Sequence, residues 1–272
     1  MRRAIFILIV VSVALLAGIA HAKDLKFAGC STSTLSYMKA VAAAYEAKTG
    51  IKIGVKGGGA TLGIKSAVAG TADLGGTCRH LIEGKDPAGA KLTVVAYDAL
   101  VFIVHKNNPA NNITKDQMIK VFEGKIKNWK ELGGSDKPII VVERKSKKAG
   151  VRLLLKELLG YDIKLTDSSI KLQSSSEVEK EIVKNPFAFG VTGSGSAVQR
   201  ELKLLSYEGV APIKENFVNK KYPDLIRPLY IATTEQPSED VKKFLVYILS
   251  DKGQAVVAKN AISIEEYKMR MK

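Results

Sequence analysis

The chain has 272 residues, which is enough for one large domain or two domains of moderate size. Its composition is that of a soluble globular protein, with a formal net charge of +15 that comes mostly from lysines spread along the chain. A nucleic-acid-binding surface concentrates basic residues among aromatic side chains, and the sequence has no such stretch, so no nucleic-acid partner is expected. A diffuse lysine surplus is typical of a solvated surface, and it also steers anionic ligands toward a cleft.

The N-terminal segment predicts a secretory signal peptide. Arg2 and Arg3 form its basic end, an apolar run covers residues 4–20, and Ala20-His21-Ala22 is a small-x-small cleavage motif. The apolar run is near the lower limit for a membrane span, so we expect cleavage near Ala22 rather than a membrane anchor. Loss of the two arginines, in a segment without acidic residues, lowers the formal charge from +15 to +13. The mature protein is expected to be exported and soluble.

Two successive strand–turn–helix units follow this segment. The predicted elements are, in chain order, a strand at residues 25–28, a polar turn at 29–34, a helix at 35–48, a strand at 51–55, a glycine turn at 57–59, a helix containing residues 64–68, a strand at 72–74 and a polar turn at 75–79. Two such units in succession predict an α/β sheet whose loops gather at one edge. In open sheets of this kind the carboxyl ends of the strands hold the ligand.

The glycine turn is a candidate anion site. Gly57, Gly58 and Gly59 let the backbone approach a ligand closely, and the helix that begins there points free N–H groups outward. Those groups and the helix dipole favour an anion, and Arg79 adds a forked cation one loop away. The alternative is an ordinary tight turn between a strand and a helix, which three glycines alone do not exclude.

The rest of the chain contains further strands and helices, with no repeat array. A β-rich run at residues 92–105 is long enough to pass from one domain to another, and Trp129 is interpreted as a packing anchor. The remaining predicted elements are a helix at 114–122, a strand at 138–142, helices at 151–159 and 177–184, strands at 187–191 and 227–233, and a mostly helical segment at 238–259.

Several motifs along the chain, in this order and spacing, match the pattern of one family. They are AGCSTS at residues 28–33, GGGATLGIK at 57–65, ADLGGTCR at 72–79, IKVFEGKIKNWKELGG at 119–134 and RPLY at 227–230. With them, the chain resembles the periplasmic phosphate-binding proteins of Pst-type ABC importers. The matching pieces span nearly the whole mature chain.

The resemblance implies an α/β, two-lobed periplasmic-binding-protein fold with crossing strands between the lobes. After the signal peptide at residues 1–22, lobe 1 is expected at residues 23–97 plus 203–272 and lobe 2 at residues 98–202. The implied function is that of a periplasmic solute-binding protein, which captures an oxyanion, phosphate by default, for an ABC permease. No enzyme activity, metal or cofactor is expected, and the protein is expected to bind inorganic phosphate or a related oxyanion as a monomer.

In this family, backbone N–H groups and hydroxyls from several loops hold the phosphate. Carried over to this chain, the resemblance gives the ligand-binding residues Ser31, Thr32, Ser33, Gly59, Ala60, Thr61, Cys78, Arg79, Arg144, Ser146, Ala149 and Gly150.

The chain departs from the family pattern at two places. Ala60 stands where the family has serine, and Ala149-Gly150-Val151 stands where it has Ser-Gly-Thr. Ser146, Arg144 and Arg152 are close enough in sequence to compensate, but Arg144 is one residue out of register. Each missing hydrogen bond to a charged ligand weakens binding by about 1.5–3 kcal/mol. The sequence therefore leaves open whether the anion is phosphate or another oxyanion.

Two other functions stand as alternatives. The missing Ser-Gly-Thr motif is also consistent with a binding or sensor module that has a changed ligand and no transport role. An enzyme is disfavoured, because the sequence shows no convincing Ser-His-Asp set, paired-carboxylate constellation or metal-ligand cluster.

Cys30 and Cys78 are the two cysteines of the chain. The resemblance places both in loops at the ligand edge of the first lobe. One reading is a disulfide, which is typical of an exported protein with two cysteines. A reduced pair that holds a soft metal together with His80, or that reacts with the ligand, is a second reading. The third is a pair of small buried thiols.

Overall fold

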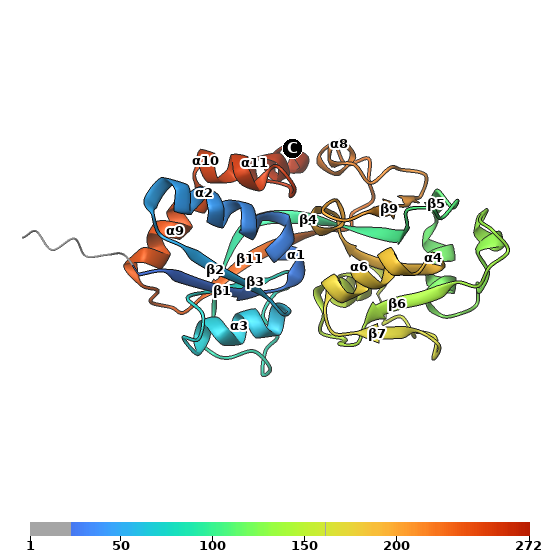
Figure 1. Cartoon of the computed structure of the whole chain (residues 1–272), viewed down its shortest axis with the longest axis horizontal. Coiled ribbons are helices and arrows are strands. Elements are labelled where there is room, and N and C mark those ends of the chain that lie inside the picture. The colour runs from blue at the N-terminus through green and yellow to red at the C-terminus, as the bar shows by residue number, and fades with distance from the viewer. Residues whose placement is uncertain (1–22, 161) are drawn as a thin grey trace, which may run out of the picture.

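The computed structural model describes residues 23–160 and 162–272, and the predicted signal peptide at residues 1–22 lies outside this part of the chain. The described residues form two α/β lobes side by side (Figure 1). Two strands, β4 (Lys91–His105) and β11 (Ile226–Thr233), run along the junction of the lobes and pair antiparallel with each other. The predicted two-lobed α/β fold with crossing strands is confirmed.

The other strands are short. They are β1 Leu25–Gly29, β2 Ile53–Gly57, β3 Leu74–Thr77, β5 Asn112–Ile113, β6 Ile140–Arg144, β7 Ile170–Leu172, β8 Ala188–Gly193, β9 Leu202–Leu204 and β10 Ser206–Tyr207. One continuous sheet runs in the order β2-β1-β3-β11-β4-β8-β6-β7, and β9 also pairs with β4. β5 and β10 form a separate two-stranded sheet.

The helical segments cover this sheet in both lobes (Figure 1). They are α1 Ser31–Ser33, the π-helix η1 Thr34–Met38, α2 Lys39–Thr49, α3 Ala60–Val68, α4 Lys115–Phe122, the 3₁₀ helix η2 Trp129–Leu132, α5 Gly150–Leu159, α6 Ser175–Lys184, α7 Ser194–Ala197, α8 Lys214–Val218, α9 Glu239–Leu249, α10 Asp251–Val257 and α11 Ile264–Met271.

Three loops leave the first lobe at the same edge of its sheet. β1 lies between β2 and β3 and pairs in parallel with both, so that Gly29 is aligned with Gly57 on one side and Gly76 on the other. The chain therefore leaves all three strands at one edge, as the two strand–turn–helix units predict. These exits carry Cys30, Cys78 and the N-terminus of α3.

The polar segment after β1 is helical, so the prediction of a turn at residues 29–34 is wrong. Cys30 caps α1 by accepting a hydrogen bond from the Ser33 amide at its sulfur, at 3.4 Å. The Thr34 and Ser36 hydroxyls donate to backbone carbonyls one turn earlier, at 3.1 and 2.7 Å. These hydrogen bonds satisfy the hydroxyls inside the helix. A segment rich in serine and threonine can therefore be helical, although its composition is typical of a turn. The predicted helix consequently begins four residues earlier, at Ser31.

The predicted polar turn at residues 75–79 is also partly wrong, because Gly75, Gly76 and Thr77 belong to β3. These glycines serve packing rather than a turn. A Cβ atom on Gly75 would lie 2.3 Å from the carbonyl oxygen of Gly63 in α3. The absence of side chains thus allows α3 to lie directly on the sheet.

The second lobe follows its predicted helices closely. Thr114 caps α4 in a capping box with Gln117, as the predicted start at residue 114 requires. Trp129 is fully buried and donates from its indole nitrogen to the Phe187 carbonyl at 2.9 Å, so its role as a packing anchor is confirmed. α5 begins at Gly150, one residue before the predicted start.

The two lobes have separate hydrophobic cores. Phe27, Tyr37, Leu74 and Phe244 are among the buried residues of the first core, and Phe102, Phe122, Trp129 and Phe189 are among those of the second. The prediction that residues 203–272 return to lobe 1 stays a prediction. Because Tyr207, Phe217, Tyr222 and Leu225 pack in the second core, we propose that the second lobe extends to Leu225 and that β11 begins the return crossing.

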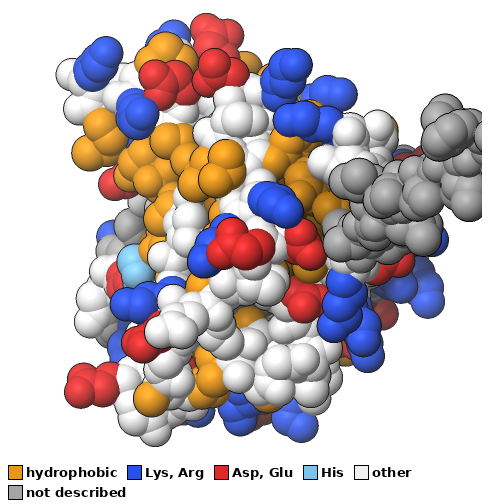
Figure 2. Space-filling model, turned by 90° about the vertical axis from the view of Figure 1, so that its left-hand side faces the viewer, with side chains coloured by type: hydrophobic (Ala, Val, Ile, Leu, Met, Phe, Trp, Pro, Cys, Tyr) orange, Lys and Arg blue, Asp and Glu red, His pale blue; other side chains and the backbone are white. Residues whose placement is uncertain are grey.

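Lysine and arginine side chains are interspersed with acidic ones on the end of the molecule shown in Figure 2. Apolar side chains lie between them on the same face. None of the described helices is both long and apolar enough to cross a membrane.

Candidate anion-binding cleft

A cleft of about 190 Å³ lies where the first-lobe loops face the start of α5. It brings together residues that are far apart in the sequence. Of the predicted ligand-binding residues, those that line it are Gly59, Ala60, Thr61, Cys78, Arg144, Ser146, Ala149 and Gly150. Cys30, Gly58, Leu62, Lys148 and Gln173 also line it and were not in the predicted set.

Two helix N-termini face this cleft from opposite lobes. On the first lobe, Gly59 precedes α3 with a φ of 120°, a conformation that favours glycine, and Ala60 and Thr61 form the first turn. On the second lobe, Ala149 precedes α5 and makes no capping hydrogen bond with its side chain. The first N–H groups of a helix have no partner within it, and the helix dipole makes that end positive. The cleft therefore favours an anion from both sides.

Arg144 supplies a cation at the end of β6. Its guanidinium donates to the Ser175 hydroxyl at 3.2 Å and to the Gln173 carbonyl, while its buried Nε has no partner among the described residues. Burial lowers the pKa of this guanidinium, and burial also raises the pKa of the adjacent Glu143 carboxyl to about 7. A buried donor without a protein acceptor is costly unless another group or solvent satisfies it.

Arg227, on the crossing strand β11, is a second cation beside the cleft. Its guanidinium donates to Asp98 at 2.9 Å and to the Thr32 hydroxyl at 3.4 Å. Its Nη1 is buried and has no partner within the described part of the chain. This nitrogen lies near the cleft wall, because a Cβ atom on Gly150 would be 3.2 Å from it. The predicted site residues do not include Arg227, although the RPLY motif that contains it was part of the resemblance.

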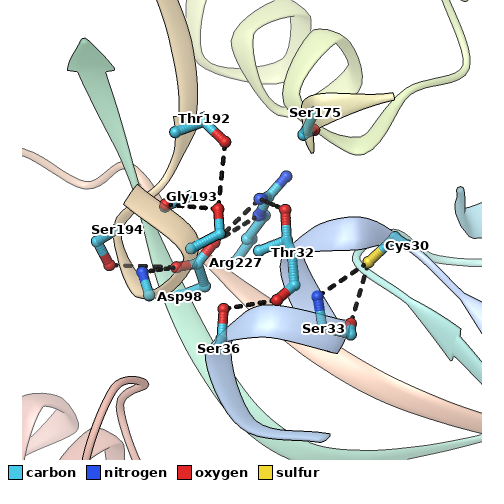
Figure 3. A network of polar contacts seen from close by, with 12 residues as sticks. Cys30, Thr32, Ser33, Ser36, Asp98, Ser175, Thr192, Gly193, Ser194 and Arg227 are labelled. Atoms are coloured by element: carbon cyan, nitrogen blue, oxygen red, sulfur yellow. Dashed lines mark hydrogen bonds and ion pairs between the residues drawn. The ribbon is translucent and has the colours of Figure 1, made fainter. Parts of the chain in front are cut away.

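Asp98 joins the two lobes at the crossing (Figure 3). One carboxylate oxygen accepts from Arg227, and the other accepts from the Ser194 hydroxyl and the Gly195 amide, both at 3.1 Å. All of these groups are buried, and Thr32 connects the same network to α1 of the first lobe. The network fixes the position of Arg227 relative to both lobes.

Ser31, Thr32 and Ser33 do not line the cleft. They form α1, and they are buried behind it. The Ser33 hydroxyl contacts the Cys30 sulfur at 3.0 Å, and the Thr32 hydroxyl accepts from Arg227. The Ser33 and Thr32 side chains thus contact Cys30 and Arg227 and do not line the cleft.

Arg79 is also held away from the cleft. Its guanidinium forms a two-pronged ion pair with Asp86, at 2.6 and 2.9 Å, and donates to the His80 carbonyl and the Thr61 hydroxyl. The hydrogen bond from Arg79 lowers the pKa of Asp86. Arg152 is similarly engaged, because it donates to Asp162 at 2.9 Å. The sequence offered Arg79 as a ligand cation, and its pairing with an acid seven residues later was not predicted.

The two cysteines are free and buried, and both line the cleft. The neighbouring Cys30 thiol lowers the pKa of the Cys78 thiol to about 6, with a further contribution from Arg227, and the neighbouring Cys78 thiol raises the pKa of Cys30. In the described residues, no cluster of three or more His, Cys, Asp and Glu side chains is arranged to hold a metal ion.

This geometry is that of a two-lobed binding protein, with a cleft between two helix N-termini. A family model described as the PBP superfamily domain matches residues 17–252, and the chain belongs to this superfamily.

Two relatives of the chain are phosphate-binding proteins. The phosphate-binding protein PstS of Borreliella burgdorferi is 31% identical over 189 residues, which are 66% of this chain and 67% of that protein. The phosphate-binding protein PstS of Bacillus subtilis is 31% identical over 202 residues, which are 73% of this chain and 66% of that protein. The matched region therefore spans about two thirds of the length of each relative.

Solved structures extend the likeness to nearly the whole chain. A structure from Clostridium perfringens, described as a phosphate ABC transporter substrate-binding protein with bound phosphate, is 33% identical with a TM-score of 0.79 and covers 88% of this chain and 99% of its own. An ABC-type phosphate transport receptor from Vibrio cholerae is 26% identical with a TM-score of 0.63, over 88% and 99% of the two chains.

Proposed function

We propose that this chain is an exported solute-binding protein that captures inorganic phosphate in its interlobe cleft and delivers it to an ABC permease in the periplasm. The observation that carries the proposal is the convergence of two helix N-termini, those of α3 and α5, on one small cleft beside Arg144. Backbone N–H groups and a guanidinium are strong donors to phosphate oxygens. The Clostridium perfringens relative, which has bound phosphate, supports the choice of anion.

The proposed donors divide into direct and indirect groups. The direct donors are the first amides of α3 and α5, the Thr61 and Ser146 hydroxyls and Arg144. Cys78 lies at the cleft wall between them. We propose that Thr32, Ser33 and Arg79 act indirectly, through the contacts that fix Arg227, Cys30 and Thr61, and that Ser31 acts as a buried part of α1.

The proposal also covers how the protein works. The two lobes close over the anion about the crossing strands, and the ligand is released unchanged, so no catalysis is involved. The N-terminal 22 residues act as the cleaved signal peptide, and the mature chain works as a monomer. A closing hinge of a few strand residues is a common device in two-lobed binding proteins.

Calorimetric titration of the mature, ligand-stripped protein with phosphate tests this function. Dissociation constants in the micromolar range or tighter are expected. Arg144→Gln removes a charged donor and should weaken binding by about 10- to 100-fold. Lys147→Gln is the matched control, because Lys147 is exposed, pairs with Asp162 and does not line the cleft. Absence of phosphate binding to the wild-type protein would sink the proposal.

A second candidate is a binding or sensor module for a different oxyanion. It is favoured by one observation, which is that Ala149 and Val151 bring no hydroxyl to the start of α5. Arsenate, sulfate, molybdate and selenite therefore belong in the same titration series. Tighter binding of one of them than of phosphate would establish the changed-ligand reading.

A further inference from the structure

The two thiols occupy adjacent strand exits. Gly29 of β1 is aligned with Gly76 of β3, so Cys30 and Cys78 each lie one or two residues beyond the same point of a parallel pair. Neighbouring strands are about 4.8 Å apart, and disulfides form at Cα separations of roughly 4.4–6.8 Å. Both residues line the cleft. The fold therefore holds them at a spacing compatible with a disulfide.

Of the two cysteines, Cys78 lies beside a cationic group. A Cβ atom on Gly150 would lie 2.7 Å from the Cys78 sulfur and 3.2 Å from Nη1 of Arg227, so the sulfur and this guanidinium nitrogen border the same small space. The neighbouring Cys30 thiol lowers the pKa of the Cys78 thiol to about 6, and the positive charges of Arg227 and Arg144 contribute to this shift. Thiolates near cationic groups are the thiols that react with oxidants.

We propose that Cys30 and Cys78 are a site of oxidative modification, at which a hydroperoxide forms a disulfide that tightens the binding of the anion in the cleft. The part that concerns the anion rests on the proposed function. The Cys78 thiolate attacks the peroxide oxygen, the O–O bond breaks, and a sulfenic acid forms as an alcohol or water leaves with a proton. The Cys30 sulfur then displaces the sulfenic hydroxyl as water, so that the peroxide is reduced and the two thiols are oxidised.

The sign of the effect follows from charge. In the reduced protein the Cys78 thiolate adds a negative charge to the wall of the cleft. This charge attracts the Arg227 guanidinium and partly neutralises it. A phosphate anion entering the cleft meets repulsion from this thiolate. The disulfide is neutral, so oxidation removes the repulsion. The positive charge of the Arg227 guanidinium is then free to attract the bound anion. Charges a few ångströms apart in a partly buried site interact strongly enough for a change of roughly tenfold or more in affinity.

The first measurement detects the modification without any anion. The full mature protein, purified in reductant, is treated with hydrogen peroxide and analysed by mass spectrometry and thiol titration. Loss of both thiols and of two hydrogen atoms, reversed by reductant, is expected. Cys30→Ser should instead trap a sulfenic acid on Cys78, and Cys78→Ser should react far more slowly. Persistence of both thiols in the folded wild-type protein would overturn the proposal.

The second measurement compares the phosphate affinity of the reduced and oxidised protein at neutral pH. Tighter binding by the oxidised form is expected, and Cys78→Ser should bind phosphate as tightly as the oxidised protein and no longer respond to peroxide. Equal affinity of the two forms, or weaker binding after oxidation, would overturn the coupling. If neither form binds phosphate while the disulfide forms, the proposed function and the coupling fail, and the modification site stands.

Discussion

Ala149 is the residue at which ligand binding and helix stability meet. It occupies the N-cap position of α5, where its methyl group offers neither an acceptor to the helix amides nor a donor to the cleft. A serine at this position can do both, because its oxygen accepts from a first-turn amide while its hydroxyl hydrogen points to the ligand.

We therefore expect Ala149→Ser to raise the free energy of unfolding by about 1 kcal/mol and to tighten phosphate binding by roughly tenfold. Chemical denaturation measures the first effect and calorimetry the second. Ile213→Ser is the control, because it introduces a cap residue at α8, outside the cleft, and should leave phosphate affinity unchanged. A higher free energy of unfolding together with an unchanged phosphate affinity would mean that the α5 N-terminus does not contact the anion.

The sequence predicts the position of some cleft residues and not of others. Gly59 belongs to the glycine turn, which local pattern marks as a candidate anion site, whereas Gly150 was expected there only through the family resemblance, and both line the cleft. Arg79 was expected to contact the ligand, but it forms an ion pair with Asp86 instead. A guanidinium pairs with a nearby carboxylate as readily as with an anionic ligand, so the sequence alone does not distinguish the two. Arg227 was missed because its approach to the cleft depends on Asp98, which is 129 residues away in the sequence. Such long-range pairing leaves no local signal.

At the level of elements, the packing of α3 against β1 and β3 places the glycine loop. Gly63 makes this packing possible, since a Cβ atom there would lie 2.5 Å from the Gly76 carbonyl oxygen and 2.9 Å from that of Ala28. These are backbone atoms in the middle of the sheet, so the conflict can be relieved only by a shift of the helix.

Gly63→Ala should lower the free energy of unfolding by about 1–3 kcal/mol, even though alanine is the better helix former. It should also weaken phosphate binding, because the shift moves the amides of the first turn of α3. Lys65→Ala, on the exposed face of the same helix, serves as the control and should change neither property. Urea denaturation and calorimetry on both variants provide the comparison, and a stable Gly63→Ala variant with wild-type affinity would refute the argument.

Helices and strands that are long enough to show a periodic pattern, or that have a capping residue, could be predicted from the sequence. β1, β2 and α4 have clear periodicity or an N-cap signal, and they lie within a few residues of their predicted bounds. β5, with two residues, is too short to carry an alternating pattern. The helical start at α1 was missed because the Cys30 sulfur caps it and the hydroxyls of the next turn, in η1, bond to backbone carbonyls, which composition alone does not reveal.

At the scale of the whole molecule, the link between the lobes is a buried charge pair. Asp98 and Arg227 are 0% and 3% exposed at their side chains, and each is also hydrogen-bonded to a lobe, through Ser194 and Thr32 respectively. The partners compensate each other in the interior, so removal of one charge leaves the other buried without its counterion.

Asp98→Asn keeps the shape of the side chain and one acceptor oxygen but removes the negative charge. We expect a loss of roughly 3–5 kcal/mol in the free energy of unfolding, measured by urea denaturation, because the Arg227 guanidinium stays buried. Asp116→Asn is the comparison, since Asp116 pairs with Lys120 on the exposed face of α4 and should have no measurable effect. A loss for Asp98→Asn as small as that for Asp116→Asn would show that solvent reaches Arg227 at the crossing. In that case the crossing strands would not hold the lobes through a desolvated pair, and the lobe angle would have to be set by the backbone pairing of β4 and β11 alone.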